Sequence, residues 1–365
     1  MREAEANDDK EIDKRIAMRV LTTLPQEDLR KVSDAARQAE AAGFDGLITQ
    51  ENRNDPFLSL GVAAVATETI GLATAVAIAF PRSPMVMANA AWDLQIASRG
   101  RFVLGLGPQI RAHNEKRFSV PWVAPISRLR EYVQALRAIW AAWEKGERLR
   151  FEGQHYTFTL MTPNFVPPSL GLPMVPITLA AVGPKALHLA GQVADGVVLH
   201  PFSTRRYHEE VVLPSLRDGL TESGRDFDRF EISGGGFIAT GPDEAAVARM
   251  FEWVRTRVGF YGSTPAYWPV LEIHGLGDLG RKLNALSKQG RWSEMTASIT
   301  DEVVHLFAAV GTHKQIAQAI EQRFAGLSDA VFASINSAVP SDLPSEVLTD
   351  IHRISTRFKG FKTEW

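Results

Sequence analysis

Short apolar runs alternate with amphipathic stretches along most of this chain of 365 residues. The clearest example spans residues 73–118. There the apolar run Thr74–Phe80 precedes a proline-bounded turn, a helical pattern over Met85–Ala97 and a second apolar run, Phe102–Leu106. Neither run alternates with polar residues, which is typical of parallel strands covered on both faces. The pattern therefore predicts strand–helix–strand units, which bind ligands at the loops after the carboxyl ends of their strands.

Eight such units are expected along the chain. The predicted strands are Met18–Thr23, Gly46–Thr49, Thr74–Phe80, Phe102–Leu106, Ile177–Ala181, Gly196–His200, Phe230–Thr240 and Ala330–Ser334. The predicted helices are Gln26–Ala42, one opened by Pro56, Met85–Ala97, Arg128–Trp143, Pro184–Val193, Tyr207–Ser223, Thr312–Phe324 and Pro344–Phe358. Eight strands that are each followed by a helix favour one closed (β/α)8 TIM barrel over a doubly wound sheet.

Two stretches interrupt the alternation. Residues 145–176, after the fourth helix, are rich in Gly, Pro and aromatic residues and contain hairpin-like segments. Residues 258–301, after the seventh strand, have an irregular pattern. We interpret both as insertions, and the first is long enough to cover one end of a sheet. The prediction is a single barrel domain over residues 18–358, flanked by tails at 1–17 and 359–365.

Composition excludes several functions. The net charge is −2 and no long basic run occurs, which argues against nucleic-acid binding. The longest apolar run, Leu72–Phe80, is far shorter than the roughly 20 residues of a membrane span. The absence of cysteine excludes disulfides, thiolate ligands and a cysteine nucleophile, and it fits a reducing, cytoplasmic environment. Residues 1–17 are charged and lack the apolar core of a signal peptide, so we expect a tail or partial helix there.

Common catalytic motifs are missing from the sequence. It has no GxSxG, GxxxxGK or HExxH motif, and no GxGxxG opens a helix after the first strand. The nine histidines are scattered without metal-ligand spacing, so no metal site is expected.

A family resemblance adds more than these patterns. The segments SRGRFVLGLG, AWDLQIAS and AAVGPKALHLAGQVADG, with a strand that runs into Arg-Ser-Pro, resemble the bacterial luciferase-like monooxygenase superfamily. The segments DPFLSLGVAA, AFPRSPMVMA, RFEGQHYTFTLMTPNF, HPFSTRRY, FYGSTPAY and DEVVHLFAAVG resemble its branch of coenzyme F420-dependent oxidoreductases. The resemblance extends from Met18 to about Arg357. It implies a TIM barrel with an insertion lid, an active site at the carboxyl face, a deazaflavin or flavin cofactor, and a homodimer.

The resemblance also implies catalytic candidates. In deazaflavin-dependent members an acid–histidine pair follows the second strand, and the matching residues here are Glu51 and Asn52. The acid is kept, but an amide cannot act as a general acid or base. His113, after the fourth strand, is a better acid–base candidate because histidine titrates near neutral pH. His200 ends the sixth strand, where a barrel places substrate contacts. Without the resemblance, these residues have simpler interpretations. Glu51 would be a solvated loop carboxylate, Asn52 would be a turn residue, and His113 would be a packed or solvated side chain.

Cofactor contacts follow from the same resemblance. Relatives often have a non-proline cis peptide bond at the end of the third strand, and the matching bond is Ala75–Val76. The implied contacts are Ala75, Val76, Gly107, Pro108, Gln109, Ala180, Ala181, Val182, Gly183 and Pro184. Small side chains admit a ring system closely, and amides at a helix start suit an anion. Ile110 stands where sugar-phosphate-oxidising relatives are often acidic, which argues against that substrate.

Polar and aromatic residues near the predicted mouth have two readings. Arg205 and Arg206 could meet a phosphate or a poly-glutamate tail, or they could be solvated. The second insertion contributes residues that could line a lid or only pack it, and these are Tyr261, Ser263, Thr264 and Tyr267.

The main hypothesis is hydride transfer between C5 of coenzyme F420 and an unknown small organic substrate, with the barrel orienting the ring and excluding water. The first alternative is an FMN-dependent monooxygenase that uses reduced flavin and O2. The second is a paralogue that binds a flavin or deazaflavin without turnover, because the usual histidine is Asn52.

Overall fold

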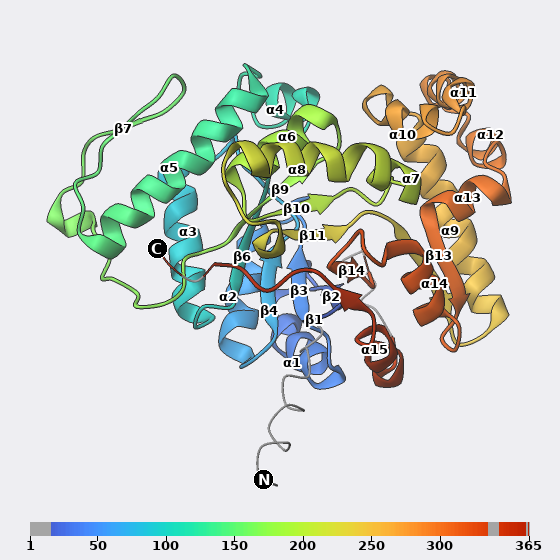
Figure 1. The fold of residues 1–365 in the computed structure, drawn as a ribbon, viewed down its shortest axis with the longest axis horizontal. Coiled ribbons are helices and arrows are strands. Elements are labelled where there is room, and N and C mark those ends of the chain that lie inside the picture. The colour runs from blue at the N-terminus through green and yellow to red at the C-terminus, as the bar shows by residue number, and fades with distance from the viewer. Residues whose placement is uncertain (1–15, 335–342, 363, 365) are drawn as a thin grey trace, which may run out of the picture.

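Eight parallel strands pair around a closed ring in the computed structural model, which describes residues 16–334, 343–362 and 364. In ring order they are β2 (Arg19–Thr23), β3 (Gly46–Thr49), β4 (Gly71–Thr74), β6 (Phe102–Gly107), β9 (Ile177–Ala181), β10 (Gly196–Leu199), β11 (Glu231–Gly234) and β14 (Ala330–Phe332). The ring closes because β4 pairs with both β3 and β6, and β14 pairs with both β11 and β2. The predicted (β/α)8 barrel is confirmed (Figure 1).

Helices cover the outside of this barrel (Figure 1). They are α1 (Val32–Ala42), α2 (Pro56–Ala66), α3 (Pro84–Ala97), α5 (Pro125–Lys145), α6 (Pro184–Val193), α8 (Leu213–Glu222), α14 (Ile316–Phe324) and α15 (Ser345–Ile351). α2 and α3 begin alike, with a side-chain cap from Asp55 or Ser83 followed by a proline. No helix in the described part of the chain is long and apolar enough to cross a membrane.

Three aspartates at the amino ends of strands fasten the bottom of the barrel. The residues directly before β3, β10 and β14 are Asp45, Asp195 and Asp329. Each of these carboxylates accepts a hydrogen bond from a backbone N–H of a neighbouring strand. The donors are Val20 (2.6 Å), Ile177 (2.8 Å) and Ile232 (2.8 Å). Because the strand register is set at this end, the loops at the carboxyl ends are free to carry a site.

The third strand is shorter than predicted. The sequence predicts one strand over Thr74–Phe80, but β4 ends at Thr74 and a separate β5 (Ala77–Ile78) follows. The Thr74 hydroxyl accepts from the Gly105 N–H (2.9 Å) and donates to the Gly105 carbonyl (2.7 Å). The Thr74 hydroxyl thus bonds both the N–H and the carbonyl of Gly105, which would otherwise pair with the backbone of the neighbouring strand. The chain bulges between β4 and β5.

The seventh strand divides in two. The sequence predicts one strand over Phe230–Thr240, but only β11 belongs to the barrel. Gly234 and Gly235 have positive φ angles (78° and 91°) and turn the chain away. The second part, β12 (Phe237–Gly241), pairs in parallel with β13 (Ala308–Thr312), a strand that the sequence analysis did not predict and whose last residue it placed in a helix.

The first insertion contains the expected hairpin, and the second is helical. β7 (Phe151–Glu152) and β8 (Thr157–Phe158) pair antiparallel beside α5. The region predicted to be irregular instead forms α10 (Trp268–Glu272), α11 (Gly277–Lys288) and α12 (Trp292–Ala297), between α9 (Glu244–Gly262) and α13 (Asp301–Phe307). The two insertions lie at opposite ends of the view in Figure 1.

Several element ends also differ from prediction. The first helix begins with a 3-10 turn, Leu29–Lys31, and the predicted helix at Tyr207–Ser223 comprises α7 (Arg205–Tyr207), a π-helical turn (His208–Val212) and α8. The last helix, α15, ends at Ile351, because the chain then forms β15 (Ser355–Thr356) on β1 (Ile16–Ala17). Most of the predicted N-terminal tail, residues 1–15, lies outside the described residues.

Candidate active site

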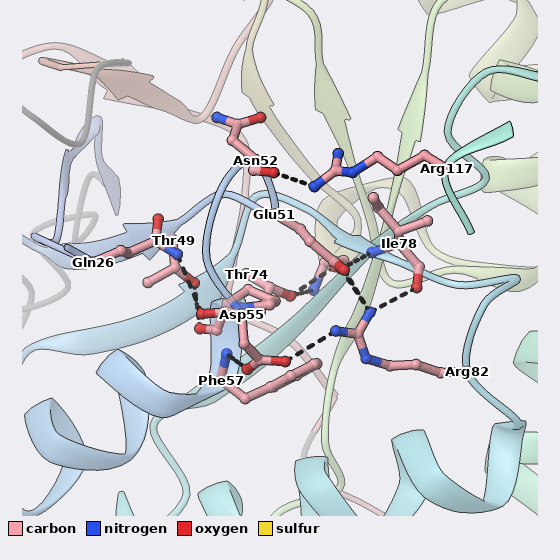
Figure 2. Close-up of polar contacts among 12 residues, drawn as sticks. Gln26, Thr49, Glu51, Asn52, Asp55, Phe57, Thr74, Ile78, Arg82 and Arg117 are labelled. Carbon is pink, nitrogen blue, oxygen red and sulfur yellow. Dashed lines mark hydrogen bonds and ion pairs between the residues drawn. The ribbon is translucent and has the colours of Figure 1, made fainter. Parts of the chain in front are cut away.

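Glu51 follows β3 at the carboxyl face, and its carboxylate is buried in a network of donors (Figure 2). The side chain is 7% exposed and accepts from the Ile78 N–H (2.7 Å) and from Arg82 Nη1 (2.7 and 2.9 Å). The Glu51 N–H also donates to the Val76 carbonyl (3.4 Å). Glu51 is therefore not a solvated loop residue: it fastens the bulge between β4 and β5.

Arg82 completes this network, and the sequence analysis missed it. Its guanidinium donates to Glu51, to Asp55 Oδ2 (3.0 Å) and to the Ile78 carbonyl (3.2 Å), as Figure 2 shows. The two carboxylates raise the pKa of Arg82 against the opposing effect of burial. Asp55 also caps α2 through the Phe57 N–H (2.8 Å). The Arg-Ser-Pro turn marks this arginine in the sequence, but no pattern shows that it faces Glu51.

The predicted cofactor residues at three strand ends meet at one rim. The structure has the expected cis peptide bond between Ala75 and Val76. A Cβ placed on Gly107 would lie 2.8 Å from Val76 Cγ2 and 3.4 Å from Ala180 Cβ. The bulge, the end of β6 and the end of β9 are thus in close contact, and the Val76 side chain packs over Gly107 at this rim.

The remaining predicted contacts extend the rim. Pro184 opens α6 after Gly183, where an added Cβ would meet nothing within 4 Å. The Val182 carbonyl accepts from the Tyr207 hydroxyl (3.1 Å), and Ala181 ends β9. Open backbone at the start of a helix suits the close approach of an anionic ligand.

The segment after β6 has a fixed backbone as well. The Pro108 carbonyl accepts from Asn114 Nδ2 (2.8 Å), and Gln109 has a positive φ of 61° while its side chain accepts from the Ile110 N–H (2.9 Å). The Gln109 side chain is thus engaged with its own loop.

Asn52 and His113 lie further out at the mouth. Both are exposed. Asn52 Nδ2 donates to Gln50 Oε1 (3.1 Å). The main-chain carbonyl of Asn52 accepts from the Arg117 guanidinium, which reaches across the mouth (Figure 2). His113 lies on α4 (Arg111–Lys116). Neither side chain is hydrogen-bonded to Glu51 in the described part of the chain.

His200 lies directly after β10, and its ring packs against two tyrosines of the second insertion. The ring centroids lie 4.4 Å from Tyr261 and 4.8 Å from Tyr267. Nδ1 accepts from the Phe202 N–H (3.0 Å), which leaves the proton of the neutral ring on Nε2. Burial lowers the pKa of His200 to about 4. His200 is therefore neutral near pH 7.

The other polar candidates are occupied by local contacts. Arg205 pairs with Glu209 (2.9 Å) and Arg206 with Glu210 (2.7 Å), each one helical turn along. Ser263 donates to the Phe260 carbonyl (2.7 Å) at the end of α9, where Thr264 continues the chain. Among the described residues, no group of three or more His, Cys, Asp or Glu side chains could hold a metal ion.

Taken together, the fold and the rim define a TIM-barrel protein whose candidate site lies at the carboxyl face of the strands. The family model described as luciferase-like monooxygenase matches residues 15–329. The chain therefore belongs to the luciferase-like monooxygenase family.

Individual relatives agree with this assignment. The uncharacterized protein Rv1360 of Mycobacterium tuberculosis is 47% identical over 325 residues, covering 89% of this chain and 95% of that protein. The 5,10-methylenetetrahydromethanopterin reductase of Archaeoglobus fulgidus is 29% identical, covering 81% of this chain and 87% of the reductase. The solved structure of the coenzyme F420-dependent tetrahydromethanopterin reductase from Methanopyrus kandleri matches with a TM-score of 0.73 at 18% identity, over 93% of this chain and 98% of that one. It shows the same fold.

Proposed function

We propose that this protein is a coenzyme F420-dependent oxidoreductase that transfers a hydride between the deazaflavin and a small organic substrate. The observation that carries the proposal is the close contact of Val76, Gly107 and Ala180 at the rim where three strand ends meet. Such a surface allows a planar ring system to lie against the strand ends, and the open start of α6 suits an anionic tail. F420 is favoured because a relative with a named activity is a reductase, and a matching solved structure of such a reductase is described as coenzyme F420-dependent.

In this proposal the site residues have different tasks. Ala75, Val76, Gly107, Pro108, Gln109 and residues 180–184 contact the cofactor. His200 contacts the substrate, and Asn52 and His113 lie at its entrance. We assign Glu51 a positioning role and not the proton-carrying role that the resemblance implies, because its carboxylate is already bound by the Ile78 N–H and the Arg82 guanidinium.

Two other functions compete with this one. An FMN-dependent monooxygenase is favoured by the description of the family model. A binding protein without turnover is favoured by Asn52, which stands where deazaflavin-dependent relatives have a histidine.

Titration with each cofactor separates these functions. We expect saturable quenching of F420 fluorescence and an affinity for F420 at least about tenfold higher than for FMN, equivalent to 1.4 kcal/mol. The reverse preference would favour the monooxygenase. If F420 binds and no hydride transfer is found for the parent while Asn52→His gains it, the non-catalytic reading is correct.

We also propose a homodimer formed through α2. This helix has no charged residue, and its outer stripe consists of the exposed Leu58 (60% exposed) and Val65 (76% exposed) with the partly buried Gly61 and Val62 between them. A helix that is apolar on its outer as well as its inner face is typical of a buried element.

A further inference from the structure

A surface pocket of about 700 Å³ lies between α7, α13, β13 and α14, on the right of the view in Figure 1. This volume is within the range of roughly 300–1,000 Å³ that small-molecule sites occupy. We call it the α14 pocket, and its lining includes Thr204, Arg206, Ala308 and Arg323. Among the described residues that line it, none is a predicted cofactor contact. The α14 pocket is therefore separate from the proposed cofactor rim.

Arg323 on α14 is a buried cation without a carboxylate partner. The residue is 7% exposed, and the part of the chain that the structure describes forms no ion pair with it. Its Nη2 donates to the carbonyls of Ser203 (2.7 Å) and Gly235 (3.1 Å), but Nε and Nη1 have no partner among these residues. A buried charge is costly unless an opposite charge pairs with it. An anion in the adjoining pocket would supply that pairing.

The other charged groups of the α14 pocket leave an excess of positive charge. Arg205 pairs with Glu209 (2.9 Å) and Arg206 with Glu210 (2.7 Å), so the three arginines of the lining face two glutamates. The pKa of Arg323 is lowered to about 10, by burial and then by Arg205, so the group stays charged near pH 7. Arg206 binds its glutamate through Nε, which leaves its terminal nitrogens for a ligand.

Two histidines near these arginines agree with a positive potential. The pKa of His208 is lowered to about 3 by burial and then by Arg323. The pKa of His274, which lines the α14 pocket, is lowered by burial and then by Arg206. Both rings are therefore neutral near pH 7. Such shifts are expected where cations outnumber anions.

Another part of the lining is apolar. β13 contributes Ala308, Ala309 and Val310, and Leu306 and Ala319 come from α13 and α14. A bare inorganic anion would leave this wall in contact with water, whereas an organic group would cover it. The α14 pocket thus fits an anion that is carried on an apolar body.

We infer that the α14 pocket binds the phosphate group of a phosphate monoester, with the apolar part of the ester against β13. Guanidinium groups bind phosphate through charge-assisted hydrogen bonds that can be bidentate. A phosphate is preferred to a carboxylate because its larger charge and its three free oxygens can meet more than one arginine. The inference does not depend on the proposed function, because the cofactor rim is a separate site.

The test is calorimetric titration of the full chain, with and without F420. The probes are phenyl phosphate, benzoate, benzyl alcohol and inorganic phosphate, and the variants are Arg206→Gln and Arg323→Met. Arg281→Gln is the matched control, because it also removes an arginine from an ion pair along a helix, with Asp278 (2.6 Å) on α11. Neither residue of that pair lines the α14 pocket.

We expect saturable binding of phenyl phosphate, with an affinity at least about tenfold higher than for each other probe. Arg206→Gln should lower this affinity about fivefold or more, because it removes a guanidinium and leaves Glu210 unpaired. Arg323→Met should lower it about tenfold, whereas the control should stay within about twofold of the parent. Saturating F420 should leave the affinity unchanged.

Several results would overturn the inference. They are absent binding of phenyl phosphate, equal affinity for benzyl alcohol, or an affinity that Arg206→Gln leaves unchanged. Loss of binding when F420 is present would assign the phosphate to the cofactor site. Equal affinity for benzoate or for inorganic phosphate would refute the assigned ligand class. If Arg323→Met does not fold, Arg206→Gln and its control still decide the outcome.

Discussion

Glu51 illustrates at the scale of a residue how burial changes an interpretation. The resemblance places Glu51 in a proton-handling pair. Its carboxylate, however, accepts hydrogen bonds from one backbone N–H and from the Arg82 guanidinium. A buried carboxylate with such partners is held by them, and removing its charge leaves the arginine partly unpaired. The residue is therefore expected to matter first for the shape of the bulge.

The substitution Glu51→Gln tests this role. We expect a loss of about 2–3 kcal/mol in the free energy of unfolding, because an amide cannot replace the charge-assisted bonds to Arg82. The matched control is Glu68→Gln, which removes the exposed ion pair with Arg99 (3.0 Å) and should cost below about 1 kcal/mol. Denaturant unfolding measures both, and equal losses would contradict the assignment.

Glu40 predicts a pH dependence of stability. Its carboxylate accepts from the N–H groups of Glu68 (3.0 Å), Thr69 (2.6 Å) and Ile70 (3.0 Å) in the loop before β4. Burial raises the pKa of Glu40, but these bonds outweigh it and lower the pKa from 4.5 to about 2. Since the folded state has the lower pKa, this stabilisation is complete above about pH 4.5 and is lost as pH falls towards 2.

We expect Glu40→Gln to cost about 1–2 kcal/mol at pH 7, a value reduced for the partial exposure of the group. The difference between variant and parent should shrink between pH 4.5 and pH 2. Urea unfolding at several pH values measures it. A difference that stays constant over this range would show that the carboxylate charge is not what stabilises the loop.

Elements show what the sequence could predict and where it failed. β3, β9 and α6 match their predicted bounds, because continuous apolar runs and a Pro at the helix start are local signals. The break after Thr74 and the turn at Gly234 depend on contacts between distant strands, which local periodicity does not contain. The helices of residues 258–301 were missed because their short lengths and frequent Gly and Pro hide the helical period.

In the candidate site, too, some features could be predicted from the sequence, and others depend on contacts between distant segments. Strand ends bring Val76, Gly107 and Ala180 together, as the resemblance implies. Arg82 was missed because its partner Glu51 lies on another loop, and the contacts of His200 with Tyr261 and Tyr267 depend on how the second insertion folds.

The rim between β6 and the bulge gives a prediction about an element junction. A Cβ at Gly107 would come 2.8 Å from Val76 Cγ2, so Gly107→Ala must push the bulge out of place. We expect F420 affinity to fall about tenfold. Gly259→Ala in α9 is the control, because its added Cβ would meet neighbours at 3.6 Å, an ordinary contact. Fluorescence titration of F420 checks this, and equal affinities would show that the ring does not lie at this junction.

For the whole molecule, the outer stripe of α2 calls for a partner, because exposed Leu58 and Val65 lie on a helix without a charged residue. In a two-fold symmetric dimer, this stripe would pack against the same stripe of the second protomer, and the apolar area of both would be removed from water. We expect the parent to sediment as a dimer, and Val65→Lys to shift it towards monomer by placing an unpaired charge in the contact. Leu160→Lys, at a residue 79% exposed in the first insertion, is the control and should remain dimeric. Sedimentation velocity over a range of concentrations distinguishes these outcomes, and a parent that stays monomeric at every concentration would leave α2 without this role.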